Sequence, residues 1–496
     1  MSDRRRKSLA AWIHCFEHIS VTHRSALTRV IAALDQIERD RSLNPWSYVD
    51  RTGALASAQA SDERHAHGQA LGALDGVLVA LKANIAVKDW PWDAGVERLR
   101  SRIASEDAPL VKHLRAAGAI LLGLTRMDEA ALGASGLTID GPIGLPRCGD
   151  YSPGGSSGGA AVAVAAGHCE VAVGTDTIGS VRIPASLSGL CALKPRRHSL
   201  SLRGIEPLHP HYDTAGPIAS SVTDVLRLYT ALKGEGLKGE VLKREPPRGP
   251  TLIYLADNTL ARLPHATRKA YMQVVDQLRK RVAAQSNPIS QVTDARTRCD
   301  GTEFEALIEA LPLVRRALFT LCEAQLADHW REREGTELLE RARLGQAQGF
   351  SPPLQAMLAY GAGLNLNQRQ AFENLLASFR TRWDALSMAA RRQSEGPVIW
   401  LLPTTPVCEF RHQDGAPKEL ADWTCLASIT GWPALSMPTD SLTASTNPSA
   451  RGRTPSLSLQ LISADLDEER LCRTALEVSR DLLASGDPNT LSTTDM

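Results

Sequence analysis

The sequence predicts an α/β protein in which helices cover the faces of a β-sheet. Three observations lead to this fold class. Between residues 74 and 125, a run rich in Val, Leu and Ile, an amphipathic stretch and a second apolar run follow one another. The segment AAVAVAAG at 160–167 is small and apolar on every side, which suits a buried helix. After a long, charged helical block, a strand pattern returns at 397–406, so we expect one sheet built from both ends of the chain.

The first third of the chain alternates between helical and strand patterns. Leu27, Ile31, Leu34 and Ile37 recur at helical spacing and predict a helix over 23–41. The next expected elements are a buried strand within 74–90, a helix over 107–118 with Pro109 at its start and Gly118 at its end, and a strand at 119–125.

The remaining elements follow from the same signals of period and turn residues. They are a glycine-rich loop at 133–159, strands at 170–176 and 187–195, a helix at 220–232, a Lys-, Gly- and Pro-rich linker at 233–250, a mostly helical block at 264–393, a polar loop at 440–454, a strand at 455–463 and a terminal helix at 467–484.

Composition and charge narrow the function classes. The 56 basic and 55 acidic residues nearly cancel, so no long-range field favours nucleic acid or an anionic membrane. The nine cysteines are scattered and odd in number, which predicts reduced thiols rather than a disulfide framework or a zinc site. The sequence contains no run of about 18 apolar residues, which a membrane-spanning helix would need. We therefore expect a soluble, cytoplasmic protein.

The segment PGGSSGG at 153–159 is the first stretch that can carry chemistry. Glycine-rich loops bind phosphate in nucleotide-binding proteins, but a P-loop needs Gly-Lys-Ser/Thr at the start of its helix. Here Gly158, Gly159 and Ala160 follow, without a lysine. Taken alone, the segment is compatible with a simple tight turn before a helix.

The segment GTDTIGSVRIPA at 174–185 is the second. A serine nucleophile needs a base, donors for the oxyanion and a backbone bend that exposes its Oγ. Gly179 can supply the bend before Ser180, and successive N–H groups from Thr177 onward can form an anion-binding nest. No histidine stands in a triad context, but Lys82 ends the apolar run GVLVALK and can act as a base if burial keeps it neutral. A strand-end lysine reaching for solvent is the alternative.

These stretches, in this order, resemble the amidase signature family. The segments DAPLVKHLRAAGAILLGLTRMDEAALG, GLCALKPRRHSLSLRGIEPL, YDTAGPIASSVTDV, LLPTTP and ITGWPALSMP add further matches in order along the chain. The resemblance covers about 25–485, is strong over 74–225 and is weak over 235–395. It implies a single α/β/α domain, with a large, mixed, twisted sheet covered by helices on both faces.

The resemblance also implies a Ser–Ser–Lys triad. Ser180 matches the nucleophile, Ser156 the bridging serine, whose preceding peptide bond is cis in the family, and Lys82 the general base. Backbone N–H groups of Thr177, Ile178, Gly179 and Ser180 would form the oxyanion hole. No metal or cofactor is implied.

The family's supporting positions can be carried over in the same way. Ser157, Asp176 and Arg182 match residues that brace the serine loops, although Arg182 can alternatively contact a substrate carboxylate. Lys88 lies beyond the motif and is expected at the surface.

Three positions depart from the family pattern. Ile178 stands where the family usually has glycine, Ala83 replaces a common acidic residue, and the region 144–155 lacks the usual asparagine. A β-branched residue does not readily take positive φ. Either the backbone at Ile178 is therefore ordinary, or the oxyanion hole is altered. The other two changes can reshape the pocket entrance.

The sequence thus predicts an amidase that hydrolyses a C–N bond of a small, linear amide through a Ser180 acyl-enzyme and releases ammonia or an amine. Alternatives are a ureide hydrolase, since family members that cleave small ureides carry non-glycine residues at position 178, and the A-type subunit of a glutamine amidotransferase, although Ile183 stands where that subunit has Gln. Acyl transfer to another nucleophile and a catalytically silent scaffold also stay open.

The organisation expected along the chain has four parts. They are an N-terminal helical arm at 1–70, the core with the catalytic loops at 71–232, a variable helical segment near the substrate pocket at 233–396, and the C-terminal part of the same sheet at 397–496. Trp330, Tyr360 and Phe372 are candidate pocket walls, with plain helix packing as the alternative. The family also contains many homodimers.

Overall fold

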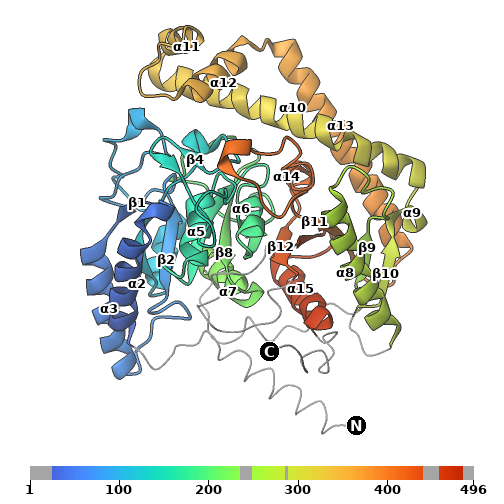
Figure 1. The fold of residues 1–496 in the computed structure, drawn as a ribbon, viewed down its shortest axis with the longest axis horizontal. Coiled ribbons are helices and arrows are strands. Elements are labelled where there is room, and N and C mark those ends of the chain that lie inside the picture. The colour runs from blue at the N-terminus through green and yellow to red at the C-terminus, as the bar shows by residue number, and fades with distance from the viewer. Residues whose placement is uncertain (1–24, 235–248, 285–288, 440–456, 484–496) are drawn as a thin grey trace, which may run out of the picture.

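A computed structural model describes residues 25–234, 249–284, 289–439 and 457–483. An 11-stranded mixed sheet runs through its middle in the order β1-β3-β2-β6-β8-β7-β12-β13-β11-β9-β10 (Figure 1). The sheet strands are β1 Trp46–Val49, β2 Leu78–Lys82, β3 Ile120–Thr125, β6 Val171–Asp176, β7 Cys191–Lys194, β8 Thr214–Ala219, β9 Thr251–Tyr254, β10 Gln291–Asp294, β11 Val398–Pro403, β12 Ala434–Pro438 and β13 Ser458–Ile462, and a separate hairpin contains β4 Leu137–Thr138 and β5 Gly141–Pro142.

Helices account for most of the remaining described chain. They are α2 Ala26–Arg39, α3 Arg51–Ala66, α4 Pro109–Ala116, α5 Gly158–Ala165, α6 Arg182–Leu187, α7 Val222–Leu232, α8 His265–Ala283, α9 Ala295–Arg298, α10 Gly301–Glu334, α11 Thr336–Arg343, α12 Pro352–Gly363, α13 Leu366–Arg392, α14 Cys425–Thr430 and α15 Glu468–Leu483. Within the described ranges, no helix is long and apolar enough to span a membrane.

The two faces of the sheet carry separate hydrophobic cores, because successive strand residues point to opposite sides. Leu78 and Ala80 of β2 pack with apolar residues of α2, α3 and α5 on one face. Val79 and Leu81 pack with residues of α4 and α7 on the other. The predicted fold class, a mixed sheet with helices on both faces, is therefore confirmed.

Most of the expected elements are present, with shifted ends. The helix expected over 23–41 is α2, and Ser25 caps it by accepting a hydrogen bond from the N–H of Thr28 at 3.1 Å. Within 74–90 only β2 is a strand, because the chain turns directly after Lys82. The strand expected at 187–195 is confined to β7, since α6 ends at Leu187 and a turn follows before Cys191.

Five sheet strands were not recognised in the sequence. Strand β1 lies inside the expected N-terminal arm, β9 and β10 lie inside the variable segment, and β12 precedes the polar loop. These four are only four or five residues long, which leaves little room for a periodic pattern. The fifth, β8, contains Gly216 and Pro217, which argue against a strand in a sequence. Most of the predicted linker at 233–250 and all of the polar loop at 440–454 lie outside the described residues.

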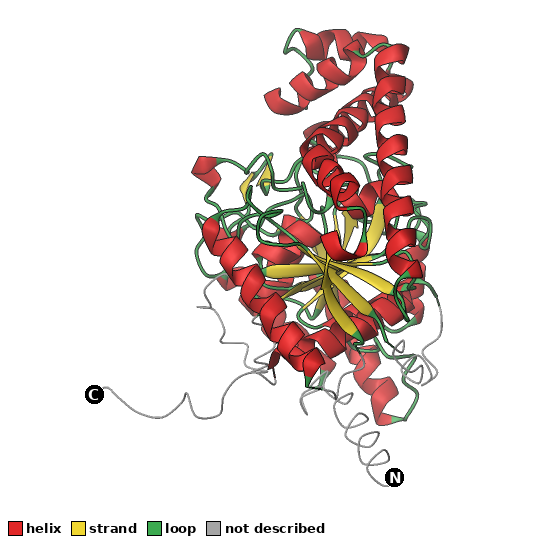
Figure 2. Cartoon of the chain, turned by 90° about the vertical axis from the view of Figure 1, so that its right-hand side faces the viewer, coloured by secondary structure: helices red, strands yellow, loops and turns green. Residues whose placement is uncertain are grey.

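A layer of long helices stands on one side of the sheet. Helix α10 runs across the molecule (Figure 1) and packs against α12 and α13. Figure 2, turned by 90°, shows long helices rising beyond the sheet. Arg315 of α10 pairs with Asp422 just before α14, at 2.5 Å, and Glu334 at its far end pairs with Arg98. Helix α10 is thereby tied to the rest of the molecule near its middle, at Arg315, and at its C-terminal end, at Glu334.

Candidate active site

The candidate site lies at one end of the sheet, where the strand directions gather several polar residues. Strands β2, β3 and β6 are parallel neighbours, so their carboxyl ends meet at one edge. Lys82 ends β2, and Asp176 ends β6. Asp128 follows β3, and Asp213 precedes β8, which runs antiparallel to β6. Lys82 and three carboxylates therefore lie at this edge.

Lys82 is fully buried, and its ammonium nitrogen faces hydroxyl groups. Nζ lies 2.7 Å from Ser156 Oγ and 2.8 Å from Thr175 Oγ1. Thr175 Oγ1 also accepts a hydrogen bond from Nδ2 of Asn84 at 3.2 Å. The side chains of Lys82, Ser156, Thr175 and Asn84 are each at most 3% exposed, so this network is shielded from water.

Burial lowers the pKa of Lys82 from 10.5 to about 7, although the negative charges of Asp128, Asp213 and Asp176 act in the opposite direction. The charged ammonium loses its hydration in the interior, and the nearby carboxylates replace only part of that stabilisation. At neutral pH a large fraction of the Lys82 side chain is thus an uncharged amine, which can accept a proton.

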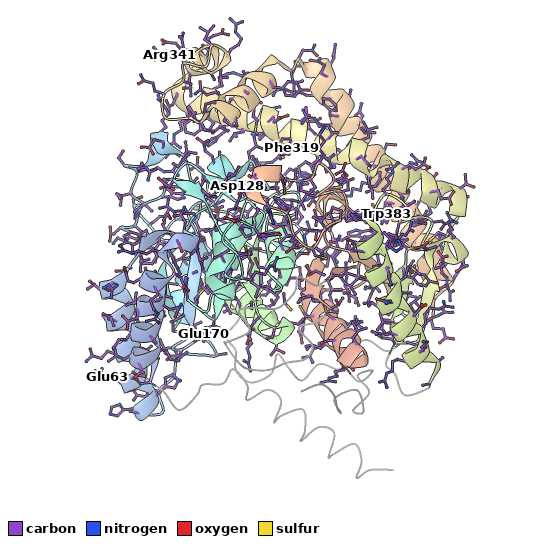
Figure 3. All side chains as sticks on the ribbon, in the orientation of Figure 1. Glu63, Asp128, Glu170, Phe319, Arg341 and Trp383 are labelled. Carbon is purple, nitrogen blue, oxygen red and sulfur yellow. The ribbon has the colours of Figure 1, made fainter. Side chains whose placement is uncertain are left out.

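Asp128 and Asp213 are themselves buried and held by donors. Asp128 accepts hydrogen bonds from the backbone N–H groups of Ser135 and Gly136 at 2.9 and 3.2 Å. It lies near the middle of the molecule, below α10 in the view of Figure 3. Burial raises the pKa of Asp128, and it raises the pKa of Asp213 to about 6.

The two serine loops touch through their backbones. The N–H of Ser157 donates to the carbonyl of Ser180 at 3.1 Å, and Ser157 Oγ donates to the carbonyl of Thr175 at 3.2 Å. The peptide bond between Gly155 and Ser156 is cis. A side chain at Gly155 would collide with the carboxylate of Asp128, which explains the glycine before the serine pair.

The loop before Ser180 presents unpaired amide groups. In the part of the chain that the structure describes, the N–H groups of Ile178, Gly179 and Ser180 have no hydrogen-bond acceptor. Thr177 Oγ1 donates to Asp213 Oδ1 at 2.5 Å, which anchors the start of the loop. Such a row of free donors forms a binding site for an anion or a polarised carbonyl oxygen.

The sequence left open whether Ile178, in place of the family's glycine, keeps an ordinary backbone or alters the oxyanion hole. The structure shows an ordinary backbone at this residue. Gly179 takes φ of 150°, whereas Ile178 keeps a negative φ. The β-branched side chain therefore imposes no strain. A side chain at Gly179 would collide with Thr424 Oγ1, so glycine is needed at this position instead.

Arg182 is completely buried and uses all five of its N–H donors. Two of them bind the carboxylate of Asp176, each at 3.0 Å. The others reach partners far along the chain: the carbonyl of Thr424 at 2.8 Å, Oε1 of Gln460 at 3.1 Å and Oγ of Ser428 at 3.2 Å. This geometry is that of a bracing residue and leaves no donor for a substrate carboxylate.

Asp176 is the anionic partner in this brace. Burial alone would raise its pKa, but the Arg182 guanidinium holds the pKa of Asp176 below its usual value. Since Asp176 also accepts a hydrogen bond from the N–H of Val181 at 3.2 Å, the pair fixes the chain on both sides of Ser180.

A small pocket with a volume of about 10 Å³, partly open to solvent, adjoins this network at Asn84. Its lining residues are Asn84, Ala94, Val96, Leu99, Met127, Ala130, Ala131, Glu206, Pro207, Leu326 and Trp330. Of the three candidate wall residues, Trp330 alone lines it. Tyr360 is 47% exposed, and Phe372 packs at the margin of the core. Lys88 is exposed, as expected.

Sequence reasoning did not single out four residues around Lys82: Asn84 and Thr175 in its hydrogen-bond network, and Asp128 and Asp213, whose charges raise its pKa. Asn84 lies two residues after Lys82, and Thr175 directly precedes Asp176. Their closeness in sequence to these predicted site residues could have indicated that they belong to the site. Asp128 and Asp213 are distant in sequence, and only the order of strands in the sheet brings them to Lys82.

The chain has relatives of known family. The Amidase family model matches residues 29–472. The A-type subunit of the glutamyl-tRNA(Gln) amidotransferase of Salinibacter ruber is 38% identical over 208 residues, which are 42% of this chain and 40% of that protein. The corresponding protein of Thermobifida fusca is 31% identical over 442 residues, or 84% and 85% of the two chains. Against the first of these relatives, and against that of Acidothermus cellulolyticus, the chain spans only about two fifths of the relative's length.

Solved structures share the fold. A crystal structure of an amidase superposes with a TM-score of 0.74 at 25% identity and covers 94% of this chain and 99% of its own. The peptide amidase of Stenotrophomonas maltophilia gives a TM-score of 0.71 at 24% identity and covers 93% and 94% of the two chains.

Proposed function

The chain belongs to the amidase family, and from this premise we propose that it hydrolyses the C–N bond of a small amide through an acyl-enzyme on Ser180. The observation that carries the proposal is the contact of 2.7 Å between Lys82 Nζ and Ser156 Oγ inside a water-shielded network. A buried amine that is partly uncharged at neutral pH and lies beside a serine hydroxyl can act as a general base through that hydroxyl.

The proposed reaction begins with two linked proton transfers. Neutral Lys82 accepts the proton of Ser156, and Ser156 accepts that of Ser180. Ser180 Oγ attacks the amide carbonyl carbon, and the carbonyl oxygen becomes an oxyanion. The free N–H groups of Ile178, Gly179 and Ser180 stabilise that charge, and one such donor is typically worth about 3 kcal/mol.

The second half returns the protons. Protonated Lys82 gives its proton back through Ser156 to the leaving nitrogen, and ammonia or an amine departs from the acyl-enzyme. Water then attacks the ester carbonyl, loses its proton to the same relay, and releases a carboxylic acid with Ser180 restored. One amide and one water thus give one acid and one amine.

A fluorophosphonate probe tests this proposal without knowledge of the substrate. We expect one covalent adduct by intact mass on the purified protein, none on Ser180→Ala, and labelling at least about 100-fold slower on Lys82→Met. Lys194→Met is the matched control, because Lys194 is also fully buried but its Nζ contacts the carbonyl of Pro195 rather than a serine. An adduct that persists in Ser180→Ala would overturn the proposal.

The curated relatives favour a second candidate, the ammonia-releasing subunit of an amidotransferase. Ile183, which stands where that subunit has Gln, packs with Leu187, Phe410 and Leu420 in an apolar cluster. An amide panel scored by ammonia release separates the two candidates. Release from glutamine alone, and only with a partner protein present, would replace the first proposal by the second.

A further inference from the structure

Asn84 lies between the proposed base and a neighbouring loop, and four hydrogen bonds hold it there. Its backbone carbonyl accepts from the N–H of Glu206 at 2.8 Å and from Nε1 of Trp92 at 2.9 Å. Its side-chain Nδ2 donates to the carbonyl of Glu206 and to Thr175 Oγ1, both at 3.2 Å. Asn84 is only 2% exposed. The side chain is thus fixed in one orientation, because both of its amide hydrogens have an acceptor.

The two ends of the Asn84 amide have different surroundings. A backbone carbonyl accepts only, so the amide nitrogen and not the oxygen must face Glu206. The amide oxygen Oδ1 has no hydrogen-bond partner in the described part of the chain. Asn84 therefore acts on the network around Lys82 as a donor, through its contact with Thr175 Oγ1.

The hydroxyl of Thr175 is the group that Asn84 holds. Strand β6 fixes the backbone of Thr175, which is paired with Ala215 of β8, but a threonine in a strand can still place its hydroxyl in more than one rotamer. Within the described residues, Thr175 Oγ1 has two hydrogen-bond partners, Asn84 Nδ2 and Lys82 Nζ. An uncharged amine is a weaker donor than an ammonium group, so Asn84 supplies the more constant of these two contacts.

Resting on the proposed function, we infer that Asn84 is a positioning residue for the base Lys82 and that it acts through Thr175. It holds the Thr175 hydroxyl 2.8 Å from Nζ, opposite the choice of any other rotamer. That contact in turn keeps Nζ directed toward Ser156 Oγ, at 2.7 Å. Without it, the amine loses one of its two short contacts, and its lone pair is no longer aimed at the relay.

The backbone around Asn84 gives this contact a rigid support. Ile85 and Ile205 form an antiparallel bridge directly beside it, and the exchange of hydrogen bonds with Glu206 continues that pairing. Asn84 itself follows the base by only two residues. A residue that positions a base needs such support, because a misplacement of about 1 Å can cost about 100-fold in rate.

Fluorophosphonate labelling of Ser180 measures the effect on the base. Asn84→Leu removes the donor and keeps most of the volume, so the labelling rate on its high-pH plateau should fall about tenfold, as expected for one hydrogen bond. Asn84→Ala should give a loss of similar size, and circular dichroism shows whether each variant is folded. A plateau rate that stays unchanged in a folded variant would overturn the inference.

The pH dependence separates positioning from a loosened site. The Thr175 hydroxyl accepts a hydrogen bond from protonated Lys82 and so favours the charged form. When Asn84→Leu releases that hydroxyl, the pKa of Lys82 should fall further below about 7, and the rise of labelling with pH should move to lower pH. A site that had merely opened to water would move the rise to higher pH instead, because hydration favours the ammonium form. That result would contradict the inference. The carboxylates that act on Lys82 are unchanged in the variant, and they are Asp128, Asp176 and Asp213.

A double-mutant cycle tests whether Asn84 acts through Thr175. Thr175→Val removes the hydroxyl, keeps the shape and should also slow labelling about tenfold. In the Thr175→Val background, Asn84→Leu should then cost less than about twofold, because residues that act through one contact are not additive. Thr175→Ser retains the hydroxyl and should label within about threefold of the unaltered protein. Two full and independent losses would show that Asn84 does not act through Thr175.

Trp92→Phe is the matched control. It removes the other side-chain donor to Asn84, which binds the backbone carbonyl and does not touch Thr175. This variant should label within about twofold of the unaltered protein, with the rise at the same pH, since a backbone contact of one neutral hydrogen bond is lost while the hydroxyl stays in place. A loss as large as that of Asn84→Leu would mean that any loosening of the segment has the same effect, and would refute a specific positioning role.

A measurement in Ser180→Ala protein separates this inference from the proposed function. With ¹³C-labelled lysine, ¹H–¹³C spectra follow the titration of Lys82, whose resonance is identified by its loss in Lys82→Met. Asn84→Leu should lower this pKa whether or not Ser180 is a nucleophile. An unchanged pKa would overturn the inference alone. A lowered pKa, together with failure of the unaltered protein to label at Ser180, would refute the proposed chemistry and leave the coupling of Asn84 to Lys82 established.

Discussion

Two buried lysines show how local contacts assign different roles to the same residue type. Burial lowers the pKa of both Lys82 and Lys194 to about 7. Lys82 faces Ser156 and Thr175 and is surrounded by carboxylates, whereas Lys194 donates to the carbonyl of its neighbour Pro195 at 2.9 Å. The low pKa is thus no sign of catalysis by itself, and the serine contact distinguishes the candidate base.

The pH dependence of labelling follows from the Lys82 site. Since the neutral amine is the active form, the rate of fluorophosphonate labelling should rise with pH around 7. The negative charge of Asp128 raises the pKa of Lys82, so Asp128→Asn should lower it and move this rise to lower pH. Asp213→Asn should act in the same direction. A rise that stays in place, or moves upward, in both variants would contradict this electrostatic account.

The Asp176–Arg182 pair gives a prediction for stability. Arg182→Met would leave Asp176 as a buried, unpaired carboxylate, which typically costs about 3–5 kcal/mol. Urea unfolding followed by circular dichroism measures the loss. The double variant with Asp176→Asn should recover part of it, since the uncompensated charge is then gone. A loss below about 1 kcal/mol in the single variant would show that the pair is not a brace.

At the level of elements, the predictable part of the fold is the part with strong periodicity. Helix α2 and strands β3 and β6 were expected where they occur, because their apolar residues repeat over six or more positions. Strand β1 was not expected, and α3 was covered only by the helical arm expected at 1–70, without bounds of its own. Its alanines and charged residues form no clear stripe, and it buries only Ala54, Ala58 and Ser61. Tertiary packing, rather than local pattern, decides such elements.

The end of α10 is expected to depend on Glu206. Glu206→Gln weakens its contacts with His329 and Arg333, so amide hydrogen exchange over 326–334 should accelerate by about tenfold, the equivalent of ~1.4 kcal/mol. Glu303→Gln is the control on the same helix, because the Glu303–Arg382 pair is exposed and such pairs contribute little. Equal acceleration in both variants would contradict a specific anchoring role for Glu206.

For the whole molecule, the fold class and the serine loops could be predicted from the sequence, but the order of the strands in the sheet could not. Lys82, Ser156 and Ser180 were assigned from the order of their stretches and its resemblance to the amidase signature family, since each stretch alone is compatible with a purely structural role. Asp128 and Asp213 could not be assigned, because their proximity depends on β3 and β8 flanking β2 and β6 in the sheet. The pocket wall at Trp330 likewise depends on how α10 is laid over the core.

The buried lysines also affect the stability of the whole molecule. Lys194 has a pKa of about 7 in the folded protein against its ordinary value of 10.5, so the unfolded chain binds the extra proton between these values. Its contribution therefore makes the free energy of unfolding rise with pH from about 7 to 10.5, by up to ~1.4 kcal/mol per pH unit. Lys194→Met should reduce the slope measured by urea unfolding between about pH 7.5 and 9 by about that amount. An unchanged slope would show that Lys194 is not buried as an amine.

The helical segment that carries Trp330 leaves the sheet after β10 and re-enters it in β11, with only β9 between these two strands. Its two ends, Asp294 and Val398, are therefore about 10 Å apart across the sheet and about 10 Å apart along it, given the strand spacing and register. Residues 295–397 thus form a cassette with nearby entry and exit points, while the lysine, both serines and the oxyanion donors all lie upstream of it. Such a cassette can be exchanged between relatives by recombination as one unit, because its replacement leaves β2 and β6, with the lysine and the serine loops beside them, intact.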